Sequence, residues 1–352
     1  DKTLVHDYTR KWDLQSAPSV CTGCAVGCNT MPGERYGRLK RVHNRYNAEV
    51  NGYFLCDRGR FGAGFVNSEQ RLDYPGLRRP DGRYDALDHH TALQHMLAAC
   101  SDKRVAAIGS PRASVEANYL LRTLAGADNY SPGFSDAEHA LVNQALQLQR
   151  DSGALLPDLV TIESADAVLI LGEDVTNTAP RIALALRQSV RNKAYTMAAE
   201  LRLEPWQDAA VRNLAQDQRS PLFSACSGDT KLDDVAEACW AMAPDNIARL
   251  GFAVAAAIAG DNANGFDPDT QSRANNIAEA LSAAERPLVV SGTGAASGAV
   301  LDAAAAVAAA LCTAGKRPML CLAVPEANSL GQAMLAGPGA PTLGQLAERS
   351  SA

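Results

Sequence analysis

The chain has 352 residues and a net charge of −6, from 33 basic and 39 acidic side chains. This length predicts two or three domains with sizeable cores, and the acidic balance argues against non-specific nucleic-acid binding. No apolar run reaches the roughly 20 residues that a membrane helix needs, so direct membrane insertion is not expected. The first residues are polar and lack an initiator Met and a signal peptide, which favours an excised or processed part of a longer polypeptide.

Residues 15–76 differ in composition from the rest of the chain, because they are rich in Gly, Arg, Tyr and Asn and poor in apolar runs. The segment "GERYGRLKRVHNRY" (33–46) predicts a strand or hairpin around turns. The next segment, "DYPGLRRPDGRYD" (73–85), contains the turn signals P-G and D-G. We therefore place the first domain boundary there.

From about residue 86 the pattern becomes β-α-β. Short apolar runs predict strands over 104–110, 165–174, 220–226, 286–294 and 317–324. Helical spacing predicts helices over 113–126, 135–150, 179–191, 230–242, 246–260, 272–284 and 297–311. Capping boxes support two of the starts, Ser135 with Glu138 and Thr230 with Asp233 in the equivalent place. This alternation predicts parallel sheets covered on both faces, with room for two of them.

The chain has nine cysteines, an odd number without a secretory signal, which indicates a reducing compartment. Five are scattered in apolar contexts and are interpreted as small buried hydrophobes. The other four, Cys21, Cys24, Cys28 and Cys56, follow the spacing C-x2-C-x3-C-x27-C. They are the candidate metal ligands.

Four thiolates suit either tetrahedral zinc or an iron–sulfur cluster. Zinc ribbons commonly use two CxxC pairs, whereas here three ligands come from one short loop and the fourth from far away. This pattern favours a [4Fe-4S] cluster, with zinc and unligated cysteines as the alternatives. Gly23 and Gly27 leave room for the loop to wrap, and Arg58 is the cation expected near the negatively charged site.

The motifs "CTGCAVGC" and "YFLCDRGRFG" resemble the N-terminal cluster domain of the molybdopterin oxidoreductase superfamily. More narrowly, these motifs and several others resemble, in the same order, the G-subunit family of bacterial NADH:quinone oxidoreductase, respiratory complex I. The others are "PGERYGRLKRVHNRYN", "IGSPRASVEANYLLR", "AVLILGEDVTNTAPR" and "EANSLG". The resemblance runs from about residue 8 to about residue 340.

The resemblance implies an α/β fold in which a small cluster-binding domain is followed by two Rossmann-like parallel-sheet domains, one inserted in the other. The expected domains are 1–76 for the [4Fe-4S] cluster, 77–150 plus 315–352 for the first Rossmann-like domain, and 151–314 for the inserted one. The cluster would be held by the four cysteines named above, with Arg58 near it and no catalytic residue.

The resemblance also implies an enzyme context. The chain would be a fragment working within the multi-subunit NADH:quinone oxidoreductase, without catalysis of its own. Its partners would be other peripheral-arm subunits of complex I, on the cytoplasmic face of the bacterial inner membrane. The alternative is a fragment of a catalytic molybdopterin oxidoreductase, such as a formate dehydrogenase-like enzyme.

Several departures from the catalytic members mean that molybdopterin is not expected. Those members carry Lys at the position of Arg58, and a metal-binding Cys, selenocysteine or Ser in a segment that here offers only Ser135, which the capping box explains. They also have a C-terminal domain that this chain does not reach. Glu173 and Asp174 would repel cofactor phosphates, and the glycine-rich segment 291–299 does not match G-x-G-x-x-G in register.

Overall fold

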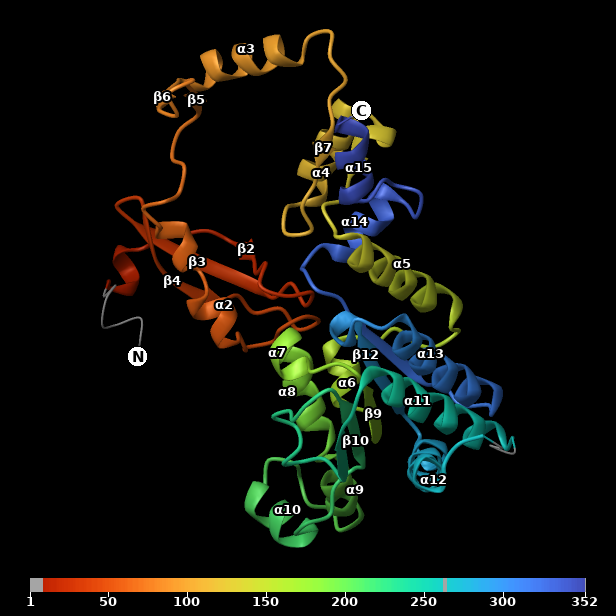
Figure 1. Ribbon diagram of the computed structural model, residues 1–352. Helices are drawn as coiled ribbons and strands as arrows, with labels where there is room; N and C mark the ends of the chain where they lie inside the picture. Colours follow the sequence, from red (N-terminus) through yellow and green to blue (C-terminus); the bar gives the residue numbers. More distant parts are fainter. Residues whose placement is uncertain (1–8, 262–264, 352) are drawn as a thin grey trace.

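A computed structural model describes residues 9–261 and 265–351, and it begins with an antiparallel sheet (Figure 1). Strand β3 (Asn29–Arg35) pairs with β1 (Gln15–Ser16), β2 (Ser19–Val20) and β4 (Arg38–Asn44). The β3–β4 hairpin confirms the prediction for residues 33–46. Its turn uses Tyr36 and Gly37, whose φ angles of 55° and 72° give the left-handed conformation that tight hairpins need.

A short helix and a second hairpin follow this sheet. Helix α2 (Asp57–Phe61) packs near β4, and the turn signals of 73–85 form the hairpin of β5 (Gly76–Arg78) and β6 (Tyr84–Ala86). Helix α3 (His89–Cys100) then leads away from the sheet, and none of its residues is buried (Figure 1).

The next part of the chain combines two segments that are far apart in sequence. Strands β7 (Ala107–Ile108) and β8 (Tyr130–Ser131) form a parallel pair, much shorter than the strand predicted over 104–110. Around them lie α4 (Val115–Ala125), α5 (Asp136–Asp151), α14 (Ser329–Ala336) and α15 (Leu343–Ser351). The fully buried Tyr130 donates a hydrogen bond to Gln332 at 2.8 Å, which joins the two segments.

The larger core is built on a five-stranded parallel sheet. Its strands are β9 (Ala167–Leu171), β10 (Leu222–Cys226), β11 (Ala238–Ala241), β12 (Pro287–Gly292) and β13 (Met319–Ala323). The order β11-β10-β9-β12-β13 places the reversal of strand order between β9 and β12. Every residue of β9 is buried, as expected for a parallel strand covered on both faces.

Helices cover both faces of this sheet (Figure 1). One face carries α11 (Pro244–Ala259), α12 (Pro268–Ala283) and α13 (Gly298–Thr313). The other carries α6 (Leu159–Glu163), α7 (Val175–Thr178) and α8 (Pro180–Ser189), and α9 (Asn192–Glu200) and α10 (Asp208–Ala215) extend the structure beyond α8. A Cβ added to Gly251 would lie 2.9 Å from that of Ala303, so this glycine allows α11 and α13 to pack closely.

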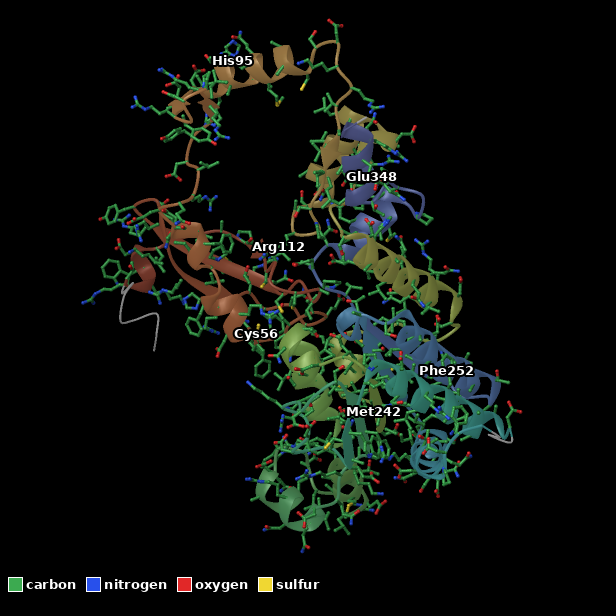
Figure 2. The ribbon with its side chains drawn as sticks, viewed as in Figure 1. Cys56, His95, Arg112, Met242, Phe252 and Glu348 are labelled. Atoms are coloured by element: carbon green, nitrogen blue, oxygen red, sulfur yellow. The ribbon has the colours of Figure 1, made fainter. Side chains whose placement is uncertain are left out.

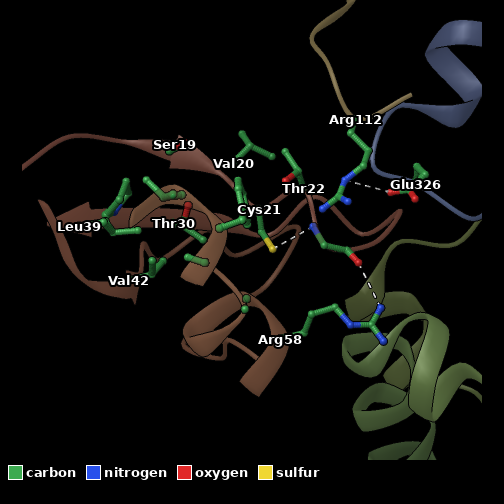
Figure 3. A pocket seen from close by; sticks show the side chains of 17 residues that line it. Ser19, Val20, Cys21, Thr22, Thr30, Leu39, Val42, Arg58, Arg112 and Glu326 are labelled. Atoms are coloured by element: carbon green, nitrogen blue, oxygen red, sulfur yellow. Dashed lines mark hydrogen bonds and ion pairs between the residues drawn. The ribbon is translucent and has the colours of Figure 1, made fainter. Parts of the chain in front are cut away.

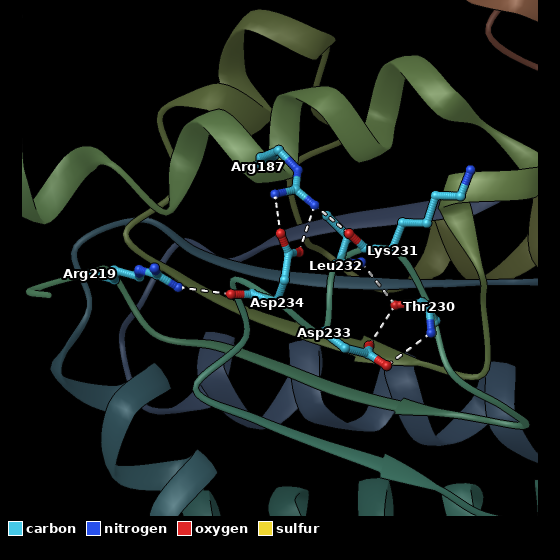
Figure 4. Close-up of polar contacts among 7 residues, drawn as sticks. All are labelled: Arg187, Arg219, Thr230, Lys231, Leu232, Asp233 and Asp234. Carbon is cyan, nitrogen blue, oxygen red and sulfur yellow. Dashed lines mark hydrogen bonds and ion pairs between the residues drawn. The ribbon is translucent and has the colours of Figure 1, made fainter.

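Two predictions about this sheet are wrong. The predicted helix over 230–242 is a series of turns followed by β11, which pairs in parallel with β10. Thr230 and Asp233 do hydrogen-bond to each other, at 2.9 Å and 2.7 Å, but they close a turn instead of starting a helix (Figure 4). Strand 319–323 was expected to return to the first α/β domain, yet it pairs with β12. For residues 238–241 the hydrogen bonds available along β10 outweigh local propensity, whereas the neighbour of β13 depends on long-range pairing that the sequence pattern does not specify.

Candidate metal centre

Three of the predicted ligands lie in the loop between β2 and β3. The loop closes on itself through a hydrogen bond of 2.8 Å from the amide of Cys21 to the carbonyl of Cys28. Gly27 has a φ angle of 62° and donates its amide to the carbonyl of Cys24, so this turn requires the left-handed region that glycine adopts freely. Cys24 and Cys28 are buried, whereas Cys21 is half-buried.

The fourth predicted ligand, Cys56, caps the start of α2 and approaches the same loop (Figure 2). Two glycines permit this approach. A Cβ on Gly59 would lie 3.2 Å from the Cys21 sulfur and 2.6 Å from Leu55, and one on Gly23 would lie 3.4 Å from the same sulfur. The structure therefore brings the Cys56 segment and the three-cysteine loop together around the Cys21 sulfur.

Asn51 ties the segment before Cys56 to the three-cysteine loop, and sequence reasoning missed it. Its side chain is fully buried and accepts a hydrogen bond of 2.9 Å from the amide of Asn29, the residue after Cys28. Its Nδ2 donates to the carbonyls of Arg45 at 3.3 Å and Phe54 at 3.2 Å. In the sequence, the dipeptide N-G at 51–52 indicates only a turn. No sequence pattern indicates that an asparagine side chain will be buried and hydrogen-bonded to several backbone groups.

The thiols interact electrostatically as one group. Burial, followed by the charges of the other three cysteines, raises the pKa of Cys28 to about 12. Burial also raises the pKa of Cys24, with the charges of Cys21 and Cys56 adding to it. Two arginines oppose these shifts, since Arg58 lowers the pKa of Cys24 and Arg181 lowers that of Cys28. Four thiolates at this site therefore need a cationic centre among them, and ligation releases their protons.

The donor set fits an iron–sulfur cluster. It consists of four thiols and no carboxylate, on a loop and a helix start that glycines hold close together. Four thiolates can ligate either a tetrahedral zinc ion or the several irons of an iron–sulfur cluster.

Arg58 extends from α2 across the cysteine loop to the parallel-sheet part of the chain (Figure 3). Its Nη1 donates to the carbonyl of Gly23 at 3.1 Å, and its Nη2 donates to the carbonyl of Asn177 in α7. A cavity of about 540 Å³ opens beside Arg58 and Cys21. Arg112 and Glu326 line its other side and form an ion pair of 3.6 Å.

A second location, at the carboxyl ends of β9 and β12, is relevant to whether the chain could bind a molybdopterin cofactor. Here the 2% exposed Glu173 accepts hydrogen bonds from the amide of Gly294 at 2.7 Å and from the hydroxyl of Thr178. A Cβ on Gly292 would lie 2.3 Å from this side chain, so the carboxyl group of Glu173 fills the glycine-rich turn. A cofactor phosphate at this switch point would meet the Glu173 carboxylate, and the residues present do not fit it.

Ser135 also contributes no metal ligand. It is exposed and accepts a hydrogen bond of 3.3 Å from the amide of Glu138 at the start of α5, as the capping box predicted.

Two family models match the chain. Residues 14–68 match the molybdopterin oxidoreductase Fe4S4 domain, and residues 71–222 match molybdopterin oxidoreductase. These matches and the four cysteines indicate a similarity to iron–sulfur proteins of the molybdopterin oxidoreductase superfamily. The Fe4S4 domain supports one [4Fe-4S] cluster as its cofactor.

Curated relatives narrow the comparison, and those at 45–50% identity are G subunits of NADH-quinone oxidoreductase. The chain is 50% identical over 339 residues to the G subunit of Pseudomonas putida, 49% over 339 residues to that of Pseudomonas fluorescens, and 46% over 342 residues to that of Escherichia coli K12. Each alignment covers 96% of this chain and 37% of the relative. The chain is therefore similar to these G subunits over nearly its whole length, and it spans 37% of theirs.

A solved structure shares the fold. The formyltransferase/hydrolase complex of Methylorubrum extorquens aligns with a TM-score of 0.51 and 15% sequence identity, over 76% of this chain and 66% of the other.

Proposed function

We propose that this chain is a cluster-bearing portion of the G subunit of bacterial NADH:quinone oxidoreductase. Cys21, Cys24, Cys28 and Cys56 hold one [4Fe-4S] cluster that belongs to the electron-transfer arm between NADH and quinone. The proposal rests on the spacing of these cysteines and on the similarity of the chain to G subunits of this enzyme, and the close approach of the Cys56 segment to the Cys21 sulfur supports it. The chain provides the ligands and their surroundings, and NADH and quinone react on other parts of the enzyme.

Arg58 belongs to this site as a cation near the cluster. Its guanidinium reaches the backbone of the three-cysteine loop at Gly23 and also the backbone of α7 at Asn177. It therefore supplies positive charge beside the thiolates and connects their loop to the neighbouring part of the chain. Arg58 replaces the Lys of the catalytic members, and a guanidinium can serve two acceptors in a fixed plane at the same time.

The partners and location follow from the same assignment. The chain packs with other peripheral-arm subunits of complex I, and the assembly lies on the cytoplasmic face of the inner membrane. Among residues 9–261 and 265–351, every helix is too short or too polar to traverse a bilayer.

The domain arrangement is a further part of the proposal. A cluster domain over 1–76 precedes a Rossmann-like domain that a second one, near 151–314, interrupts. The contacts of α14 with α4 and α5 support the interruption, because they bring residues 329–336 back to residues 115–151. The pairing of β13 with β12 moves the end of the inserted domain past residue 323.

The test is metal analysis of the full-length subunit, purified anaerobically within its enzyme. We expect iron and acid-labile sulfide in excess of those in a Cys24→Ala variant, and no molybdenum or tungsten. Zinc in place of iron at this site would contradict the cluster assignment. Stoichiometric molybdenum with pterin would instead support the alternative, a catalytic molybdopterin oxidoreductase.

A further inference from the structure

Arg181 is a buried cation with unused hydrogen-bond donors. It lies in the first turn of α8 and is 6% exposed. Its Nε and Nη1 have no hydrogen-bond partner among the described residues, and its Nη2 lies 3.7 Å from the Glu163 carboxylate, beyond hydrogen-bond distance. Burying a guanidinium in this way is costly unless another anion lies beside it.

The environment of Arg181 indicates where that anion lies. The guanidinium carbon is 5.2 Å from the ring centroid of Phe54, two residues before Cys56. Val26, within the three-cysteine loop, packs against the same apolar core as Ile182, the neighbour of Arg181. Arg181 therefore borders the cysteine site from the α8 side.

The two arginines beside the site differ in what their donors do. Arg58 is exposed, and its Nη1 and Nη2 are hydrogen-bonded to the backbone carbonyls of Gly23 and Asn177. Arg181 is buried and stacked near an aromatic ring, which leaves the edge of its guanidinium with two N–H groups to donate. Arg181 is thus the arginine equipped to bind an anion directly.

We propose that Arg181 is a positioning residue that donates its free N–H groups to the cluster on the Cys28 side and raises the cluster's reduction potential. This inference rests on the proposed function. Each electron that a reductant such as dithionite supplies makes the thiolate-bound cluster more negative, and no bond needs to form or break. A fixed cation with N–H groups directed at sulfur stabilises the reduced form more than the oxidised form.

The experiment uses the full-length subunit in its enzyme, with Arg181→Met, Arg181→Lys and the control Arg187→Met. Arg187 lies on the same helix, but its guanidinium is held by Asp234 at 2.9 Å and 2.7 Å (Figure 4). Dithionite reduces the cluster at controlled potentials, and electron paramagnetic resonance follows the signal that Cys24→Ala removes. We expect Arg181→Met to shift the reduction equilibrium at least tenfold toward the oxidised form, which is 59 mV for a one-electron couple.

Arg181→Lys should keep the reduction potential close to the wild-type value, and Arg187→Met should leave it unchanged. A wild-type potential in Arg181→Met, with wild-type iron and sulfide, overturns the inference and leaves the proposed function intact. If Arg181→Met loses its iron, Arg181→Lys decides. Iron retained by the lysine variant supports a role for the charge, whereas its loss there indicates a packing role and rejects the inference. A wild-type subunit without the cluster refutes the proposed function itself.

Discussion

Replacing Asn51 by Ala should loosen the segment that delivers Cys56 to the three-cysteine loop. Asn51 is fully buried and joins three backbone groups, the amide of Asn29 and the carbonyls of Arg45 and Phe54. Alanine can replace none of these hydrogen bonds. The Asn51→Ala variant therefore tests whether this one amide side chain holds the Cys56 segment against the three-cysteine loop.

The magnitude follows from the three lost hydrogen bonds. At about 1 kcal/mol for each bond, Asn51→Ala should lower the local free energy of opening by about 3 kcal/mol. Since every 1.4 kcal/mol is a factor of ten, local opening should become roughly a hundredfold more frequent. Cluster occupancy should also fall, because Cys56 is held less firmly against the loop.

Hydrogen exchange followed by mass spectrometry measures this effect in the peptides that cover β3 and β4. The matched control is Asn246→Ala, an exposed position in the first turn of α11, where a change within about 0.5 kcal/mol is expected. Exchange in β9 should be unchanged in both variants. The reasoning is refuted if Asn51→Ala exchanges like the wild type in β3 and β4 and keeps its full iron content.

Three further predictions concern the site and its surroundings. The Cys24→Ala variant should lose iron and sulfide, whereas Cys312→Ala, at a half-buried position of α13, should retain them. Equal iron and sulfide content in the two variants would contradict the ligand assignment. Burial raises the pKa of Glu173 in the folded protein above its value in the unfolded chain. The protonated carboxyl group therefore stabilises the folded state below the unfolded pKa, and this stabilisation is lost as pH rises through the folded pKa. Glu173→Gln should therefore raise Tm at pH 7 more than at pH 4, and an equal change at both pH values would argue against a buried charge. Arg58→Met should lower the free energy of unfolding by about 1 kcal/mol, allowing for solvent exposure, and speed hydrogen exchange in residues 20–28. Unchanged hydrogen exchange there would mean that the hydrogen bond to Gly23 does not hold the loop.

The four cysteines could be proposed as ligands from the sequence because thiolate ligation is tied to spacing. Cys21, Cys24 and Cys28 are separated by so few residues that one loop must carry them, whatever the rest of the fold does. The β3–β4 hairpin and the longer helices were predictable for a similar reason, since turn residues and helical periodicity are local signals. Helices α4, α5, α8, α11, α12 and α13 all lie where the pattern placed them.

The errors occurred where long-range pairing decides the structure. Residues 238–241 have helical spacing and a capping signal before them, yet they form an edge strand because β10 offers a row of hydrogen-bonding groups. Strand 319–323 is apolar enough to suit either α/β domain, and its pairing with β12 is visible only in the assembled sheet. The local sequence pattern indicates that a strand forms, but it does not indicate which strand lies next to it in the sheet.

The amino-acid sequence alone determines the cationic character around the four cysteines and the alternation of strands and helices, and it proposes these cysteines as ligands. Which distant groups serve the site depends on tertiary packing. Asn51 becomes a hydrogen-bonding hub because the chain folds back on β3, and Glu173 fills the glycine-rich turn because β9 and β12 are adjacent. Arg181 is one arginine among many in the sequence, and the packing of α8 near the cysteine loop buries its charge close to Phe54. Burial and unpaired donors arise from three-dimensional packing, and no local pattern records them.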